Sequence, residues 1–289
     1  MMTVFFQQML NGVIQGCIYA LIALGLSLIF GILEVANFAH GEFYMLGAFM
    51  ALFSVRFLHV PFFVAMLIAM GGMTLFGILV ERIVFRPIVG KPLINSMLLS
   101  FGLSTALANS ALFLFGADPQ KIESGLARVR FRVFGLHLTG ERLAILALSI
   151  LLVLLLAWFI QYTKTGKSMR AIAQDRVAAQ LAGIHVGRIY AITFAVAGAL
   201  AAAAGSMVGA MFFVSPEMGL SVVLKSFVIV ILGGFGNIGG VIFAAVLIGL
   251  LESLGGGYIS YAYKDAYPFL LLVVLFILRP QGLTGGGRA

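Results

Sequence analysis

The chain has 289 residues, of which 62% are hydrophobic and only 10% are charged. Soluble domains contain about 25% charged residues, so this chain lacks the polar surface that a water-soluble globule needs. These proportions exclude a soluble enzyme, a nucleic-acid-binding protein and a disordered chain. They predict a protein surrounded largely by membrane lipid, and the net charge of +8 is expected in loops near anionic headgroups.

Five apolar segments without charged residues are long enough to cross a membrane, because a helix needs about 20 residues to span the hydrocarbon layer. The five segments are 13–33, 61–80, 92–117, 143–163 and 189–214. Two further apolar runs, 43–55 and 266–278, are too short and must recruit polar neighbours. For the first, the helix would begin near Val35 and carry His40 and Glu42 below the membrane surface.

The segment 226–251 is long enough to span but is interrupted by closely spaced glycines around Asn237. The glycines of this predicted helix break are Gly233, Gly234, Gly236, Gly239 and Gly240. Backbone groups freed at such a break must face protein or water, so a broken or re-entrant helix is predicted. With this segment, the fold class is an all-α polytopic membrane protein with about eight transmembrane helices, forming a single domain over residues 1–289.

Small residues recur every four positions in the segment 189–214, which allows another helix backbone to approach closely. They form two adjacent lines, Ala201, Gly205 and Gly209, and Gly198, Ala202, Ser206 and Ala210. We expect this face to make a helix contact within the same subunit.

Two polar connections have recognisable patterns. In 116–141, Arg128, Arg130 and Arg132 alternate with apolar residues, and this period of two predicts a strand that Gly135 turns into a hairpin with 136–139. In 164–188, apolar residues at helical spacing predict one amphipathic helix from Arg170 to Gly183, which would end it. Lys and Arg are slightly more numerous on the side of 164–188, which favours a cytoplasmic position for this loop and an outside position for the amino terminus and for 116–141.

No catalytic motif is complete in the sequence. Gly166-Lys167-Ser168 resembles the end of a phosphate-binding loop, but Gln161 stands where that loop requires its first glycine. Zinc-protease and nucleophile-elbow motifs are also missing. We therefore expect no catalytic residue, and no nucleotide, metal or other cofactor bound by this chain.

Polar residues at membrane depth are the remaining candidates for function, because a charge there must pair, reach an interface or line a path. Asn37, His40 and Glu42 are predicted to face a route or to hold a helix break closed. Glu34, Glu217 and Glu252 are expected at span ends, and Lys225 could pair with Glu217 or Glu252. Two alternative functions stay open from the residues: a secondary transporter with a His40 and Glu42 proton relay, and a channel with 233–240 as its filter.

The sequence resembles the branched-chain amino-acid ABC-transporter permeases of the LivH type along its whole length. The resemblance rests on five stretches in order: 19–26, 35–42 with 46–48, 170–175 through 182–184, 233–240 and 278–283. It implies a permease subunit that moves branched-chain or related hydrophobic amino acids across the bacterial inner membrane by alternating access. Relatives with these motifs also carry amides, urea or aromatic acids.

The resemblance also implies partners and site residues. The partners would be a second LivM-like permease subunit, two cytoplasmic ATP-binding subunits and a periplasmic solute-binding protein, with no nucleic acid. Ala178, Ala179 and Gly183 are similar to the Ala-Ala-x-x-x-Gly core of the segment that couples ABC permeases to their ATPases, and Arg170 and Asp175 belong to the same stretch. Val177 stands where many importers have Glu. The translocation path or gate would include Asn37, His40, Glu42 and Asn237.

Overall fold

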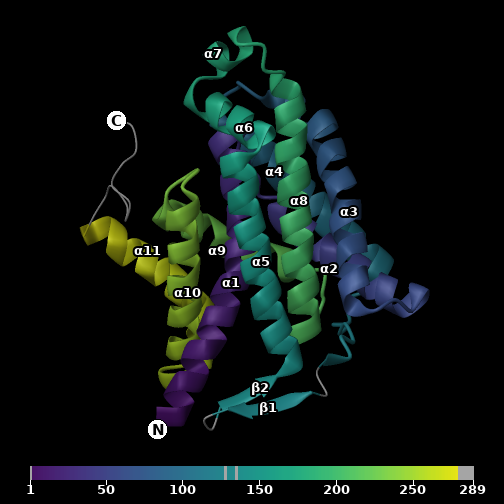
Figure 1. The fold of residues 1–289 in the computed structure, drawn as a ribbon, viewed down its shortest axis with the longest axis vertical. Helices are drawn as coiled ribbons and strands as arrows, with labels where there is room; N and C mark the ends of the chain where they lie inside the picture. Colours follow the sequence, from purple (N-terminus) through teal and green to yellow (C-terminus); the bar gives the residue numbers. More distant parts are fainter. Residues whose placement is uncertain (1, 127–128, 134–135, 279–289) are drawn as a thin grey trace.

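The computed structural model describes residues 2–126, 129–133 and 136–278, and it is dominated by long helices that run roughly along one axis (Figure 1). In chain order the α-helices are α1 (Met2–Leu33), α2 (His40–Leu58), α3 (Phe62–Val80), α4 (Leu93–Phe115), α5 (Gly140–Tyr162), α6 (Lys164–Gln174), α7 (Arg176–Leu181), α8 (Val186–Met211), α9 (Met218–Gly233), α10 (Ile238–Tyr258) and α11 (Tyr267–Leu278). Helix α3 continues through a π-helical turn (Glu81–Phe85) and a 3-10 turn (Arg86–Ile88), and a 3-10 segment (Tyr261–Ala266) leads into α11.

Eight of these helical segments, counted over the described residues, are long and apolar enough to span a membrane. They include all five predicted charge-free segments and both short runs that needed polar neighbours. The predicted all-α polytopic membrane fold is confirmed. Helix α1 begins at Met2 rather than near residue 13, and within the part of the chain that is described, α11 reaches spanning length together with the preceding 3-10 segment, 261–266.

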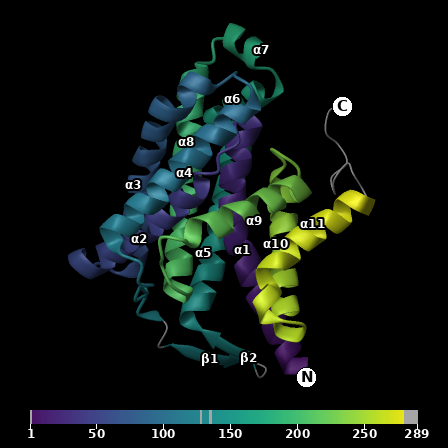
Figure 2. The same ribbon diagram turned by 180° about the vertical axis from the view of Figure 1, so that it is seen from behind.

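The core is built around α1 and α8, because 83% and 78% of the residues in their most apolar stretches are buried. Helices α2, α3, α9 and α10 pack around this pair, whereas α4, α5 and α11 lie at the periphery (Figures 1 and 2). The small residues of α8 allow its close contacts: a Cβ atom on Gly198 would lie 2.5 Å from the Met73 carbonyl oxygen of α3. The predicted helix contact within the subunit is therefore confirmed.

The two ends of the bundle differ. At one end, called here the hairpin end, β1 (Arg130–Val133) pairs antiparallel with β2 (Leu136–Thr139), with Arg130 opposite Thr139. The predicted hairpin is confirmed, although its turn residue Gly135 and the neighbouring Arg128 lie outside the described residues. The opposite end, called the α7 end, carries α6 and α7 (Figure 1).

The prediction of one continuous helix from Arg170 to Gly183 is wrong. The backbone of Asp175 is extended, and its carboxylate accepts hydrogen bonds from the amides of Val177 and Ala178, so α6 ends and α7 begins there. A short Asp side chain competes with the helical backbone in this way, and the spacing of apolar residues does not reveal it. The helix end at Gly183 is confirmed, because Gly183 has a φ of +83°.

The glycine-rich segment interrupts the helix as predicted, but it is the turn between two neighbouring helices. Helix α9 ends at Gly233, and α10 starts at Ile238 and is by itself a spanning helix. The two helices cross closely here, since a Cβ atom on Gly240 would lie 2.0 Å from the Gly233 carbonyl oxygen. The side chain of Asn237 caps α10 by accepting a hydrogen bond from the Gly240 amide.

Candidate functional site

A pocket of about 600 Å³ lies at the hairpin end, between α1, α8, α9, α10 and the start of α5. Four polar side chains on successive turns of α1 line one side of the pocket: Gln8, Asn11, Gln15 and Tyr19. Other polar and charged lining residues come from the remaining elements: Arg142, Ser221, Lys225, Glu252, Ser253, Lys264 and Asp265. Apolar side chains line the rest, among them Ile18, Ile22, Val208, Met218 and Val222. Such a mixed lining suits a small solute that has both a polar head and an apolar body.

A cluster of charges stands in the wall of this pocket, with Lys225 and Glu252 buried and Asp265 exposed. The Nζ atom of Lys225 on α9 lies 2.8 Å from an oxygen of Glu252 on α10 and 2.7 Å from Oδ1 of Asp265. The hydroxyl of Tyr19 on α1 donates to Glu252 at 2.7 Å and accepts from Lys225 at 3.2 Å. The cluster therefore ties α1, α9 and α10 together, and we name it the Lys225 cluster after its central residue.

One sequence expectation is decided by this cluster. Of the two partners considered for Lys225, the structure selects Glu252. The Glu252 side chain is only 6% exposed and is paired with Lys225, so it is buried within the protein and does not face its surroundings. The sequence could not choose between the two partners, since the pair that forms joins residues on separate helices.

The three predicted gate residues Asn37, His40 and Glu42 are all buried at the start of α2 and in the segment before it. His40 Nε2 lies 3.2 Å from the carbonyl oxygen of Ile22 on α1. Glu42 accepts a hydrogen bond of 3.0 Å from the Ser104 hydroxyl of α4. His40 and Glu42 thus face different helices, as expected for two residues two positions apart.

His40 lies directly behind the wall of the pocket, because Ile22 both lines the pocket and contacts His40. Glycine at position 25 of α1 leaves room for His40, because a Cβ atom there would lie 2.9 Å from His40 Nε2. The side chain of Asn37 has no hydrogen-bond partner within the described part of the chain. Asn237 is not brought to this region and lies at the exposed turn that begins α10.

The predicted coupling residues mainly shape the α6 and α7 segment. Arg170 donates to the Ile160 carbonyl oxygen near the end of α5, Asp175 caps α7, and Ala179 is buried. Ala178 and Gly183 are exposed.

Helix α7 exposes two large apolar side chains, Val177 and Leu181, beside the polar Arg176 and Gln180. Val177 and Leu181 are 66% and 85% exposed, whereas Met169 and Ile172 of α6 are buried. The apolar residues of the polar loop 164–188 could be recognised in the sequence as unusual. The break at Asp175 decides that those of α7 are exposed while those of α6 are buried.

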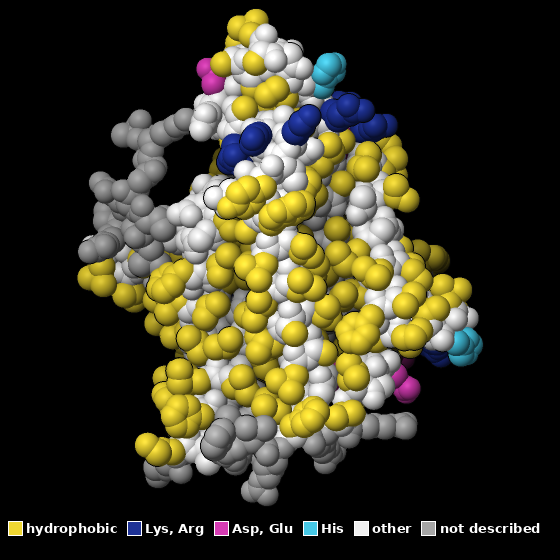
Figure 3. All heavy atoms as spheres, in the orientation of Figure 1, with side chains coloured by type: hydrophobic (Ala, Val, Ile, Leu, Met, Phe, Trp, Pro, Cys, Tyr) yellow, Lys and Arg dark blue, Asp and Glu magenta, His cyan; other side chains and the backbone are white. Residues whose placement is uncertain are grey.

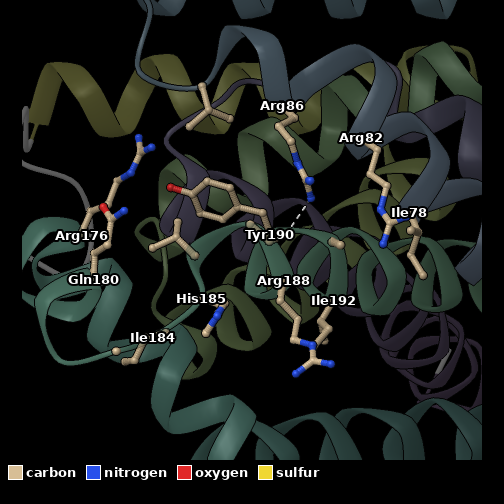
Figure 4. A pocket seen from close by; sticks show the side chains of 15 residues that line it. Ile78, Arg82, Arg86, Arg176, Gln180, Ile184, His185, Arg188, Tyr190 and Ile192 are labelled. Atoms are coloured by element: carbon tan, nitrogen blue, oxygen red, sulfur yellow. Dashed lines mark hydrogen bonds between the residues drawn. The ribbon is translucent and has the colours of Figure 1, made fainter.

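A second pocket, of about 840 Å³, lies beside α7 at the same end (Figure 4). Four arginines line it, Arg82, Arg86, Arg176 and Arg188. Arg86 binds Glu81 with two hydrogen bonds and reaches the Gly187 carbonyl oxygen, and Arg176 lies over the Tyr190 ring. Figure 3 shows Lys and Arg side chains in a band across this end, above a largely apolar wall.

Comparisons with known proteins agree with this architecture. The family model described as "Branched-chain amino acid transport system / permease component" matches residues 8–278. The chain is 32% identical to the high-affinity branched-chain amino acid transport system permease protein LivH of Escherichia coli (strain K12), over 97% of this chain and 96% of that protein.

Two further relatives extend the comparison. The chain is 30% identical to the corresponding permease protein BraD of Pseudomonas aeruginosa, over 97% and 96% of the two chains. It is 28% identical to the permease protein LivM of Escherichia coli (strain K12), over 92% of this chain and 67% of that protein. With eight spanning helices in its described residues, the chain is a multi-pass protein of the bacterial inner membrane. It belongs to the family of permease components of branched-chain amino acid transport systems.

Proposed function

We propose that the chain is one of two related permease subunits of an ATP-driven importer, and that it moves branched-chain or related hydrophobic amino acids by alternating access. The observation that carries this proposal is the match to the permease family over residues 8–278, together with an amphiphilic pocket in the membrane domain. Similarity to both LivH and LivM supports a partner subunit of LivM type.

The path begins in the pocket at the hairpin end, which faces the periplasm and a solute-binding protein. Behind the pocket wall, Asn37 and His40 are fully buried and His40 contacts Ile22 of α1, and we assign the closed gate to this layer. On another side of α2, Glu42 accepts a hydrogen bond from Ser104 of α4, and its carboxylate lies close to Gly219 of α9.

Coupling takes place at the α7 end. The exposed side chains of Val177 and Leu181 would insert into one cytoplasmic ATP-binding subunit, and the arginine-lined pocket beside α7 would face acidic groups of the same partner. Arg170 fixes α6 to the end of α5, so a movement of α7 is passed to a spanning helix. Closure of the two ATP-binding subunits would then reorient the helices around the pocket.

The test is uptake of radiolabelled leucine into proteoliposomes that contain the chain, its partner permease and both ATP-binding subunits, with the solute-binding protein outside. Uptake is expected only when all components and ATP are present. The purified chain alone should neither transport leucine in a proton gradient nor conduct ions. Uptake by the chain alone would overturn the proposal in favour of a secondary transporter.

A further inference from the structure

We propose that the Lys225 cluster binds the head group of the transported amino acid, with Lys225 taking the substrate carboxylate in place of Asp265 and Asp265 then taking the substrate ammonium. This inference rests on the proposed transport function and adds a binding site to it. The ligand class is a zwitterionic α-amino acid with an apolar side chain.

The cluster contains two carboxylates, and one is enough to neutralise Lys225. Glu252 alone neutralises Lys225, and its side chain is 6% exposed and held by Tyr19. Asp265 is 63% exposed, comes from the 3-10 segment before α11, and also binds Lys225. A charge at membrane depth needs one partner to offset its desolvation, so the second carboxylate is the one that can be exchanged.

A zwitterion fits between Lys225 and Asp265 without changing the net charge of the site. Inserted there, its carboxylate meets the Lys225 ammonium and its own ammonium meets the released Asp265 carboxylate, so every charge keeps an opposite neighbour. A carboxylate alone would face Asp265 without compensation, and an amine alone would face Lys225. The site therefore selects amino acids over simple acids, amines, amides and urea.

The residues around the cluster can contact the apolar side chain of the ligand. Ile18, Met218 and Val222 line the same pocket and supply an apolar wall. Gln15 donates to the Tyr19 hydroxyl at 2.9 Å, which orients the tyrosine that holds Glu252. Tyr19 and Gln15 are thus positioning residues, while Lys225 and Asp265 touch the ligand.

The experiment uses the complete reconstituted importer and four variants. Lys225→Met removes the carboxylate site, and the double variant Lys225→Met with Glu252→Gln removes it without leaving an unpaired buried charge. Lys121→Met is the matched control, because Lys121 is exposed and lies outside the lining of the pocket. Asp265→Asn tests the exchange. The amount of folded complex in the membrane is measured for each variant.

Leucine uptake is expected to fall by at least about tenfold in both Lys225 variants and to persist in Lys121→Met. Ligand-induced thermal stabilisation of the purified complex should be seen in the wild type with leucine, and not with isocaproate or isoamylamine at the same concentration. In Asp265→Asn, isocaproate should also stabilise the purified complex against heat, because the Asp265 carboxylate no longer competes with it for Lys225.

Three results would overturn the inference. Wild-type leucine uptake by the folded double variant excludes Lys225 as the carboxylate site, and an unchanged isocaproate response in Asp265→Asn excludes the exchange; both leave the transport function intact. A complete wild-type importer that takes up no amino acid would overturn the transport function and this site with it.

Discussion

Single glycines set the distances between the helices that surround the pocket. A Cβ atom on Gly205 of α8 would lie 2.1 Å from the Tyr44 carbonyl oxygen of α2, and one on Gly41 would lie 2.2 Å from the Gly219 carbonyl oxygen of α9. Contacts this short are with backbone, which cannot rotate away as a side chain can. These positions therefore hold the buried start of α2, with His40 and Glu42, against its neighbours.

At Gly205, substitution by alanine should push α8 away from α2 and lower the free energy of unfolding by about 1–3 kcal/mol. Gly102 of α4 is the matched control, because a Cβ atom there meets nothing within 4 Å. Gly102→Ala should leave stability unchanged or raise it by about 0.5–1 kcal/mol, as expected for a glycine inside a helix. Thermal unfolding of the detergent-solubilised protein measures both, and equal stabilities would contradict the packing argument.

Among the elements, the α6 and α7 segment depends most on local side-chain chemistry. Its shape comes from three backbone contacts: Thr163 accepts from the Gly166 amide, Arg170 reaches Ile160, and Asp175 caps α7. Helix α7 has only six residues, and an isolated helix of that length is not stable in water. Its cap is therefore a large part of what keeps Val177 and Leu181 presented outward.

Replacement of Asp175 by alanine should destabilise α7 by about 0.5–2 kcal/mol, because two amides lose their acceptor. Asp175→Asn keeps an acceptor oxygen and serves as the control. We expect the alanine variant to lose stimulation of ATP hydrolysis by the loaded solute-binding protein in the reconstituted importer, while the asparagine variant keeps most of it. Hydrogen exchange of the α7 amides separates loss of the cap from loss of partner contact. Full coupling in Asp175→Ala would argue against a role for α7.

For the whole molecule, the arrangement of the two ends predicts the orientation in the membrane. The hairpin lies at one end, and α7 with its arginine-lined pocket lies at the other (Figure 1). We expect the hairpin end to face the periplasm and the α7 end to face the cytoplasm, where basic residues are favoured.

Cysteine labelling checks this orientation. The sequence contains one cysteine, Cys17, so a Cys17→Ala background permits single introduced cysteines. A membrane-impermeant thiol reagent should label exposed Glu123→Cys in right-side-out vesicles and exposed Gln180→Cys only in inverted vesicles. The opposite pattern would reverse both the coupling assignment and the direction of the path.

The sequence by itself determined seven of the eight spanning segments found in the described residues, the position of the hairpin, the interruption by glycines and the family. Each of these depends on local composition, spacing or motifs, because insertion into lipid depends on the apolar content of one segment at a time. The small residues of α8 similarly predicted close helix contacts, although not their partners Tyr44 and Met73.

The tertiary structure alone decided the contents of the site. Lys225 pairs with Glu252 and Asp265 across different helices, and His40 meets Ile22 on α1. Apolar patterns place helices in a membrane but leave open which helices become neighbours and how each is rotated, since lipid solvates all their apolar faces equally well. Close approach at glycines and pairing of buried charges resolve that choice, and both require residues far apart in the sequence to meet.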